Sequence, residues 1–299
     1  MDLGFLGLGQ MGGAIAERLL GADIRLHVFD PDAAALARFR DLGAIEQASP
    51  AAVATVAPIV FACLPDPKIS DRVADELAAS PGAMRIYIEM STIGRGTMVG
   101  IAERLGACGV MVVDCPVSGG PVGARAGTLA TLAAGPRAAL DKLRPLLARI
   151  GSSPFEIGDT PGLGQMMKLV NNLMAIANQT IACEALVLGA KAGLDPDLMV
   201  TVVNKSTGRS TATEAMVPNA VLTRSFDFGA RLAVPYKDLV LGLAEAEALG
   251  VPMWTTETAR QVWRFALGQG MGEEDYSALI KLMERWAGAE LRGSRPASR

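Results

Sequence analysis

The sequence predicts an α/β domain followed by an all-helical domain, with one long helix joining the two. Strand-like and helix-like segments alternate over residues 1–161, which favours βαβ units on a largely parallel sheet. From residue 162 onward the apolar residues recur at helical spacing, and the pattern contains no convincing strand. A chain of 299 residues is long enough for two domains, each with its own core.

The first predicted domain begins with a short apolar strand, residues 2–8, which is followed by a helix over residues 10–20. Residues 24–30 alternate like a second strand, and an alanine-rich helix is predicted over residues 33–42. Further strands, mostly separated by segments of helical length, are expected at residues 58–63, 85–90, 109–114, 128–133 and 153–157.

The second predicted domain covers residues 162–292. Its first helix is a continuous pattern from Leu163 to Ala192 with few charges and no proline, and this helix is expected to join the domains. Later helices are expected near residues 195–206, 234–249, 254–268 and 275–288. The polar end of the chain, residues 293–299, is expected to be frayed.

Composition and charge narrow the class of protein. A net charge of −3 gives no basic field, which argues against a nucleic-acid partner. The longest charge-free run, between Glu46 and Asp66, is interrupted by three prolines, and no basic segment precedes the first apolar stretch. We therefore expect a soluble, cytoplasmic protein without a membrane partner. The cysteines form no CxxC pair and read as small buried residues, not as disulfides or a metal site: Cys63, Cys108, Cys115 and Cys183.

A glycine-rich segment, Gly7 to Gly12 (GLGQMG), directly follows the first predicted strand and opens a helix. Gly7 permits a tight turn, Gly9 lets the backbone approach a pyrophosphate, and Gly12 lets the helix pack close to the strand. Backbone N–H groups around Gln10 and Met11, at the helix start, are suited to bind phosphate charge. The alternative is a glycine-rich turn without a ligand. The context favours a dinucleotide site.

Asp30 stands 23 residues after Gly7, where the second strand is expected to end. A carboxylate there accepts hydrogen bonds from ribose hydroxyls and repels a 2′-phosphate. Arg38 and Arg40 lie in the following helix, but the adjacent residues are Pro31 and Asp32. The sequence therefore favours NAD, with NADP possible. Asp30 can equally cap the helix that starts near Asp32, and the two roles are compatible.

The proton-transfer group cannot be the single histidine, because His27 lies within the second predicted strand. The best candidate is Lys168, near the start of the long helix, whose neighbours are apolar and whose next charged residue along the helix is Glu184. Partial desolvation favours the neutral amine that acid/base catalysis needs. Asn172 lies four residues on and shares the same helix face. The alternative is an ordinary surface lysine whose stem covers apolar area.

A third segment, Asp114 to Gly120 (DCPVSGG), follows a predicted strand. Ser118, Gly119 and Gly120 can present a hydroxyl and consecutive backbone N–H groups to a carboxylate. A tight turn that needs glycine for its backbone angles is the alternative.

In this order, these segments resemble the β-hydroxyacid dehydrogenase family, which includes 3-hydroxyisobutyrate dehydrogenases and tartronate semialdehyde reductases. The resemblance covers residues 2–288. It rests on Gly4 to Gly12, on Asp114 to Gly120 with the continuation through Gly123-Ala124 and Gly127 to Leu129, on Gly162 to Asn172, and on Lys237-Asp238-Leu239.

The resemblance implies a Rossmann-type N-terminal domain, a helical C-terminal domain and an active site in the cleft between them. It implies that Lys168 is the general acid/base and that Asn172 helps to hold the reacting hydroxyl. The substrate carboxylate is then bound by Ser118, Gly119 and Gly120. Further cofactor contacts are implied at Leu64 and Pro65, at Thr92 beside the nicotinamide ribose, and at Lys237.

The expected function is NAD-dependent interconversion of a small 3-hydroxy carboxylic acid and its aldehyde or keto acid. One alternative is an imine reductase, a class related by fold that usually carries aspartate or tyrosine at the position of Lys168. The other is a non-catalytic dinucleotide-binding scaffold, a role that relatives have adopted after losing this lysine. A homodimer or homotetramer is expected, because the long helix and its successors are more apolar than a monomer's surface needs.

Overall fold

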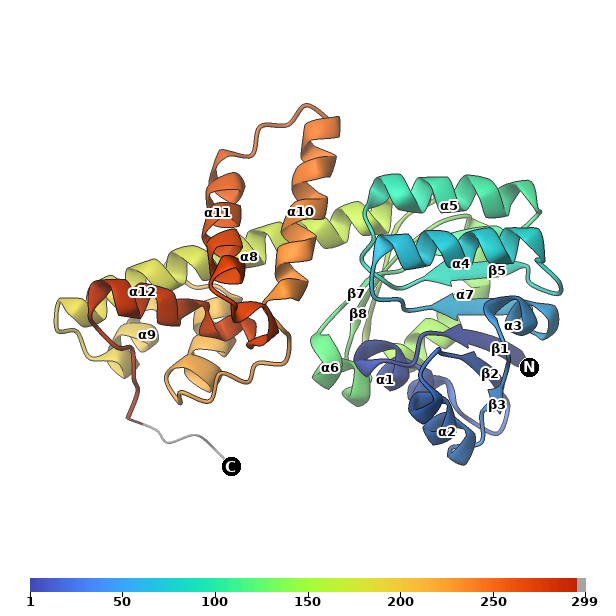
Figure 1. The fold of residues 1–299 in the computed structure, drawn as a ribbon, viewed down its shortest axis with the longest axis horizontal. Helices are drawn as coiled ribbons and strands as arrows, with labels where there is room; N and C mark the ends of the chain where they lie inside the picture. The colour runs from blue at the N-terminus through green and yellow to red at the C-terminus, as the bar shows by residue number, and fades with distance from the viewer. Residues whose placement is uncertain (295–299) are drawn as a thin grey trace. The chain divides into compact units, whose positions relative to one another are not determined.

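The computed structural model describes residues 1–294, which form two compact units. Unit 1 comprises Met1–Lys168 and unit 2 begins at Leu169, so the division falls within the long helix α8, Leu163–Lys191 (Figure 1). Of the segment expected to be frayed, residues 295–299 lie outside the described residues. The two residues before them are held, since Gly293 N donates to Leu222 O at 3.0 Å and Ser294 N to Asp197 Oδ2 at 2.6 Å.

Unit 1 is built on a sheet whose first six strands are parallel, as predicted, in the spatial order β3-β2-β1-β4-β5-β6. The strand order reverses between β1 and β4, and such a switch point is where α/β sheets bind ligands. Beyond β6 comes β8, which is antiparallel to β6 and β7 and parallel to β9. The strands are β1 (Asp2–Leu6), β2 (Arg25–Phe29), β3 (Ile45–Glu46), β4 (Ile59–Ala62), β5 (Ile86–Glu89), β6 (Met111–Asp114), β7 (Val117–Ser118), β8 (Ala130–Ala134) and β9 (Ser153–Gly158).

The carboxyl ends of five parallel strands lie in register at one edge of this sheet, which we call the carboxyl edge. Leu6, the last residue of β1, pairs with Phe29 of β2 and with Ala62 of β4. The row continues from Ala62 to Glu89 of β5, and from Glu89 to Asp114 of β6. The loops that follow these strands therefore begin side by side.

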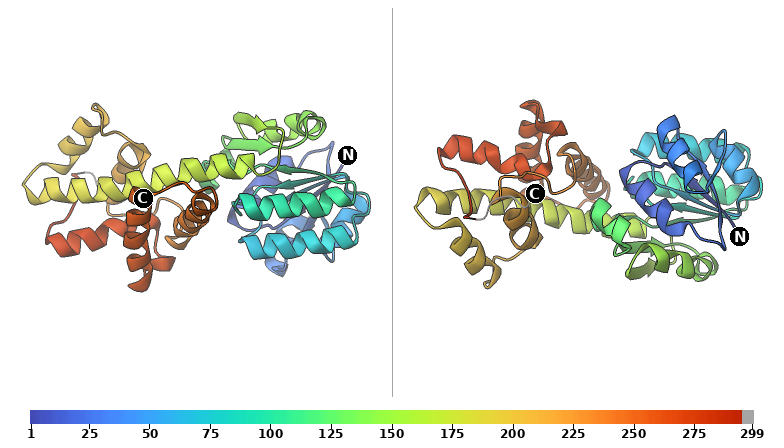
Figure 2. Two further views of the ribbon diagram at one scale, coloured as in Figure 1. Left: turned by 90° about the horizontal axis from the view of Figure 1, so that it is seen from above. Right: turned by 90° about the horizontal axis from the view of Figure 1, so that it is seen from below.

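Alternate strand residues point to opposite faces of the sheet, and each face has its own apolar core. Three helices cover the face that includes Phe5 and Val28: α1 (Gln10–Leu19), α2 (Ala33–Asp41) and α7 (Arg137–Ile150). Three others cover the face that includes Val60 and Tyr87: α3 (Pro50–Val56), α4 (Pro67–Ala79) and α5 (Arg95–Ala107). Of these, α4 and α5 lie side by side (Figure 2).

Several helices begin with a capping side chain followed by proline. Ser49 Oγ accepts from Ala52 N at 3.1 Å before α3, and Asp66 Oδ1 accepts from Ile69 N at 3.0 Å before α4. Proline at the first helical position has no N–H group to leave unsatisfied there, and its φ suits a helix. The local sequence thus determines where these helices start.

The described part of unit 2 contains helices and turns but no strand longer than the isolated bridge between Arg231 and Asp275. Its helices follow the predicted ranges closely, except that periodicity did not reveal a π-helical segment over Ala212–Val221, which includes Pro218. After α8 the elements are α9 (Pro196–Asn204), the π-helical segment, α10 (Ala233–Ala248), α11 (Trp254–Gly268), the 3₁₀ turns Met271–Glu273 and Tyr276–Leu279, and α12 (Ile280–Ala287).

Among the described residues, α8 is the one helix long and apolar enough to cross a membrane by length and composition. Half of its apolar 18-residue window is buried inside the protein. Its exposed side carries three large apolar side chains as well as polar ones: Met174, Ile181 and Leu188 are 63%, 57% and 71% exposed. These three residues recur every seven positions and form one stripe.

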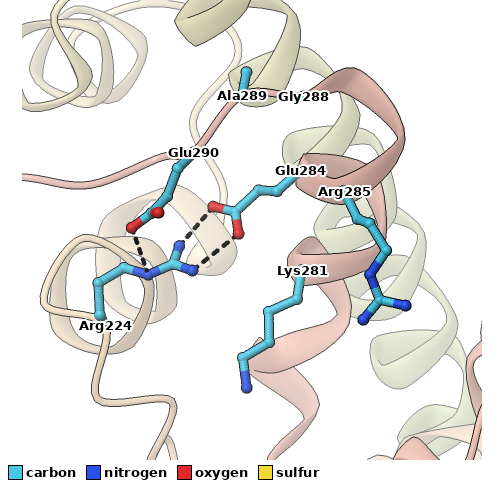
Figure 3. Close-up of a pocket in the computed structure, with 7 residues that line it drawn as sticks. All are labelled: Arg224, Lys281, Glu284, Arg285, Gly288, Ala289 and Glu290. Carbon is cyan, nitrogen blue, oxygen red and sulfur yellow. Dashed lines mark hydrogen bonds and ion pairs between the residues drawn. The ribbon is translucent and has the colours of Figure 1, made fainter.

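A buried ion pair holds the C-terminal part of unit 2 together (Figure 3). Glu284, on α12, accepts from Arg224 Nη1 at 2.5 Å and from Arg224 Nη2 at 3.0 Å, and its side chain is 8% exposed. The same carboxylate accepts from Leu291 N at 2.8 Å. One side chain thus joins α12 to the loop after the π-helical segment and to Leu291, in the segment that follows α12.

Removing this carboxylate is expected to destabilise the protein strongly. Glu284→Ala removes the two hydrogen bonds that Arg224 donates to this carboxylate and leaves the buried Leu291 N–H group without its acceptor, although Arg224 keeps its contact with Glu290. We expect a cost of about 3 kcal/mol. The matched control is Glu273→Ala, because the Arg231–Glu273 pair is 63% and 79% exposed and contributes little. Urea unfolding of both variants measures the difference. Equal midpoints would contradict the role assigned to Glu284.

Candidate functional site

The glycine-rich segment forms the turn between β1 and α1, and two of its glycines have no room for a side chain. Gly7 has φ of +91°, and a Cβ added there would lie 2.3 Å from Cys63 O. A Cβ on Gly12 would lie 2.0 Å from Gly7 O. At Gly9 the space is open, with no atom within 4 Å of an added Cβ. Gly7 and Gly12 thus shape the turn, and Gly9 leaves its outer side accessible.

The start of α1 is suited to an anion. Its N-cap is Gly9, which makes no side-chain capping bond, so the N–H groups of Gln10 and Met11 begin the helix without side-chain cover. A cavity of about 440 Å³ adjoins this turn, which is in the size range of small-molecule sites. It is lined by Leu8, Gly9, Gln10, Ala14, Glu17, Ala34, Ala35, Arg38 and Arg125.

Asp30 lies at the end of β2 and joins the two neighbouring loops. Its Oδ2 accepts from Leu8 N, within the glycine turn, at 2.6 Å. Its Oδ1 accepts from Asp32 N at 2.8 Å, while Asp32 itself caps α2 through Ala34 N. Each carboxylate oxygen can accept a further hydrogen bond, so the position predicted for the ribose hydroxyls remains chemically suitable.

The loops after β4 and β5 are tied together at the carboxyl edge. Leu64 N donates to Ser91 Oγ at 2.6 Å, and Ser91 N donates to Glu89 Oε1 at 2.9 Å. Glu89 is fully buried, so burial raises its pKa, and it also accepts from Tyr87 OH at 2.9 Å. Pro65 is exposed and Thr92, directly after Ser91, is half-buried. The cofactor contacts predicted at Leu64, Pro65 and Thr92 therefore lie in two loops that the same hydrogen bonds hold together.

Ser118 ends β7, where it pairs with Ala130 of β8, and it is half-buried. Gly119 and Gly120 follow with φ of +132° and +63°, angles that favour glycine. Both glycines are exposed. The turn thus needs its glycines for backbone reasons and also presents its backbone to solvent.

The start of α8 is held by Asp114, the last residue of β6. Asp114 Oδ1 accepts from Gly162 N at 2.9 Å and Oδ2 accepts from Gln165 N at 2.7 Å. Burial nevertheless raises the pKa of the Asp114 carboxyl to about 6, although these backbone bonds act in the opposite direction. Gly164 lies close to the backbone of β8, because a Cβ added to it would be 2.3 Å from Leu132 O.

Lys168 lies one turn after this anchored start and is half-buried. It is the last residue of unit 1, so its helix start, the glycine turn and Asp30 all belong to one compact unit. Asn172 follows one turn later on α8, within unit 2. Its Nδ2 donates to Asp238 Oδ2 at 2.6 Å, and Lys237 Nζ lies 3.5 Å from Asp238 Oδ1. Asp238 therefore joins Asn172 and Lys237 within unit 2.

His27 is structural, as predicted. It is 7% exposed, and its ring nitrogens contact Asp2 Oδ1 at 2.9 Å and Gln47 Nε2 at 3.1 Å. Four polar residues that hold the site were not predicted from the sequence: Glu89, Asp114, Gln165 and Asp238. Asp114, Gln165 and Asp238 lie within segments on which the family resemblance rests. The signal available in the sequence was a polar residue next to glycines with special backbone angles or next to a candidate lysine.

Comparisons with known proteins cover both units. Residues 2–158 match the family model described as the NAD binding domain of 6-phosphogluconate dehydrogenase. Residues 162–283 match the model described as NAD-binding of NADP-dependent 3-hydroxyisobutyrate dehydrogenase.

Two curated relatives align over almost the whole chain. The 2-(hydroxymethyl)glutarate dehydrogenase of Eubacterium barkeri is 34% identical over 296 residues, 98% of each chain. The 3-hydroxyisobutyrate dehydrogenase of Pseudomonas aeruginosa is 33% identical, covering 94% of this chain and 98% of its own.

Solved structures agree with these relatives. Mycobacterium tuberculosis 3-hydroxyisobutyrate dehydrogenase with L-serine has a TM-score of 0.87 and 28% identity, over 94% of this chain and 98% of its own. A Streptomyces aurantiacus imine reductase has a TM-score of 0.61 and 20% identity, over 95% and 99%, and shares the fold alone.

The raised pKa of Asp114 predicts how stability depends on pH. Because its folded pKa of about 6 exceeds the ordinary value of 3.8, the folded state binds this proton more tightly than the unfolded chain. Its contribution to stability is therefore present at low pH and is lost as pH rises through about 6. As pH falls from 7 to 4, the free energy of unfolding of the wild-type protein should rise relative to that of Asp114→Asn. The rise should be roughly 1.4 kcal/mol for each unit of pKa shift. Urea unfolding at each pH tests this, and a difference that is flat with pH would contradict it.

Proposed function

The chain belongs to the β-hydroxyacid dehydrogenase family, and from this we infer that it interconverts a small 3-hydroxy carboxylic acid and its aldehyde or keto acid with NAD(P). The observation that carries the proposal is local to unit 1. The glycine turn lies at the same carboxyl edge as Asp114, and Asp114 anchors the helix that bears Lys168. A nucleotide-binding turn and an acid/base candidate are thus built on one sheet.

The chain's own residues fit the cofactor. Gly7 and Gly12 fill positions where a side chain would collide with backbone, and this keeps the turn tight beside the first N–H groups of α1. These N–H groups would bind the pyrophosphate, and Asp30 would bind the adenosine ribose. Because Asp30 is a carboxylate followed by Asp32, we propose NAD over NADP. The bound nicotinamide would accept or supply the hydride.

We propose that Lys168 moves the proton of the reaction. In oxidation the neutral amine takes the hydroxyl proton of the substrate, and in reduction the ammonium returns it to the forming alkoxide. Asn172 helps to hold the hydroxyl, and its amide is oriented by Asp238. Ser118, Gly119 and Gly120 would bind the substrate carboxylate, while Leu64, Pro65, Thr92 and Lys237 would contact the cofactor.

The relatives favour this reaction over the two alternatives. Named relatives of at least 30% identity are dehydrogenases and reductases of small hydroxy acids, whereas the imine reductases support the fold alone. Lys168 and Asn172 are both present, which favours an enzyme over a binding scaffold. We also propose a cytoplasmic location, because the four cysteines are scattered along the chain and form no CxxC pair, as is usual in a reducing compartment. We propose a small-molecule substrate as partner, not nucleic acid, because the net charge of −3 gives no basic field.

We further propose that the exposed stripe of α8 binds a second copy of the chain. Met174, Ile181 and Leu188 recur every seven residues, and a stripe of this period is covered by another helix with the same period. A twofold-related copy presents the same stripe, so one surface serves both partners. Homodimer and homotetramer both satisfy this arrangement.

Replacing the proposed acid/base group is expected to abolish turnover. Lys168→Ala should lower kcat by about 10²- to 10⁴-fold while nicotinamide fluorescence still reports cofactor binding. Lys191→Ala, at the other end of the same helix, is the matched control and should keep full activity. The assay screens short 3-hydroxy acids with NAD and NADP side by side. Normal turnover by Lys168→Ala, reduction of cyclic imines instead of hydroxy-acid turnover, or tight cofactor binding without turnover by the wild type would each contradict the proposal.

A charge on the exposed stripe is expected to separate the copies. Ile181→Asp should lower the molecular mass measured by light scattering after size exclusion, because the carboxylate would be buried between apolar helices. Leu42→Asp is the control, since Leu42 is 48% exposed on unit 1 and lies outside the stripe. A wild-type monomer, or wild-type protein that sediments with lipid vesicles, would overturn the proposed partner.

A further inference from the structure

Gln165 is a buried amide that joins α8 to the loop after β5. Its side chain is fully buried, although it is polar and lies in the first turn of the helix. Its Oε1 accepts from Ile93 N at 2.9 Å and from Gly94 N at 3.3 Å, and its Nε2 donates to Ser91 O at 2.9 Å. One side chain therefore satisfies three backbone groups of a single loop.

The backbone of Gln165 is fixed as firmly as its side chain. Its N–H group donates to Asp114 Oδ2, and a Cβ added to the preceding Gly164 would lie 2.3 Å from Leu132 O and 2.8 Å from Asp114 Oδ2. Main chain and side chain of the same residue thus bind different strands, β6 through Asp114 and β5 through Ser91 to Gly94. With both bound, the helix start cannot rotate about its own axis without breaking buried hydrogen bonds.

The loop that Gln165 binds also serves the proposed cofactor contacts. It contains Thr92, and its Ser91 accepts from Leu64 N and donates its own backbone N–H to Glu89. A shift of this loop would therefore move Leu64 and Thr92 together. A shift of α8 would move Lys168, which lies three residues after Gln165 and so on the same helix face.

Resting on the proposed function, we propose that Gln165 is a positioning residue: its amide sets the rotation of α8 about its axis and thereby the place of Lys168 relative to the Ser91–Gly94 loop. An apolar side chain of similar length would leave two buried N–H groups and a carbonyl without partners. The helix start and the loop would then separate until water reached those groups. A displacement of about 1 Å of a reacting group costs on the order of 10²-fold in rate.

Gln165→Met tests this directly. We expect kcat with the hydroxy-acid substrate to fall about 10²-fold, and its KM to change little, since the Ser118 turn is untouched. The matched control is Gln179→Met, the same substitution at a buried glutamine of the same helix, where Nε2 donates to Tyr276 O at 2.9 Å in unit 2. Gln165→Met leaves three backbone groups without partners and Gln179→Met leaves one, so a loss of kcat that is confined to Gln165→Met, with both variants folded at the assay temperature, supports positioning. Equal kcat values for the two folded variants would overturn it.

Gln165→Glu supplies a second readout that a purely structural role would not move. When protonated, the introduced carboxyl accepts from Ile93 N and Gly94 N and donates to Ser91 O, so it replaces the amide in every bond. When ionised, it places negative charge against that carbonyl. Activity relative to wild type at the same pH should therefore rise at least about tenfold as pH is lowered, whereas Gln165→Met should show no such rise. Parallel pH profiles for the two variants would contradict the inference.

The outcome also separates this inference from the function on which it rests. If Lys168→Ala is inactive and Gln165→Met retains wild-type kcat, the function stands and the positioning role fails. If the wild-type protein turns over no hydroxy acid with NAD or NADP, the proposed function itself fails, and with it this inference.

Discussion

The two hydrogen bonds from the start of α8 to the Asp114 carboxylate are the interaction on which the site depends. They connect the last residue of a parallel strand to the helix that carries Lys168. The same edge of the sheet also carries the glycine turn and Asp30. The Asp114 carboxylate therefore fixes the position of the acid/base candidate relative to the nucleotide-binding loops. The cost is the burial of a charge, which is visible in the raised pKa of Asp114.

Most of the fold could be predicted because its elements are long and strongly periodic. The six longer strands predicted in unit 1 after the first differ from the observed ones by a few residues at most, and α11 was predicted with its observed bounds. The elements that were missed are those without a periodic signal. The strands β3 and β7 have two residues each, and the π-helical segment Ala212–Val221 contains an internal proline. Pairing with neighbouring strands, rather than local preference, makes β3 and β7.

The candidate site could be predicted at positions where function restricts the residue type. It could not be predicted at positions where burial restricts the residue type. Glycine at positions 7 and 12 is demanded by backbone contacts, so its spacing is visible in the sequence. Gln165 and Glu89 are ordinary polar residues in a sequence. Only the structure shows that both are buried, that Gln165 bonds to three backbone groups, and that Glu89 bonds to Ser91 N and Tyr87 OH. Periodicity reports which residues face a core, but it cannot report that a polar side chain is enclosed because it satisfies the backbone of a neighbouring loop.

The chain order of the α8 anchor has a consequence for biosynthesis. Ser91, Ile93, Gly94 and Asp114 all precede Gln165 in the sequence, so a ribosome releases every partner of the helix start before the helix itself. The parallel strands can assemble while α8 is still within the exit tunnel. The emerging helix then binds to strand ends and loops that have already folded. The first residues of α8 that reach it are the ones that bind, and they set the orientation of everything synthesised afterwards on that helix.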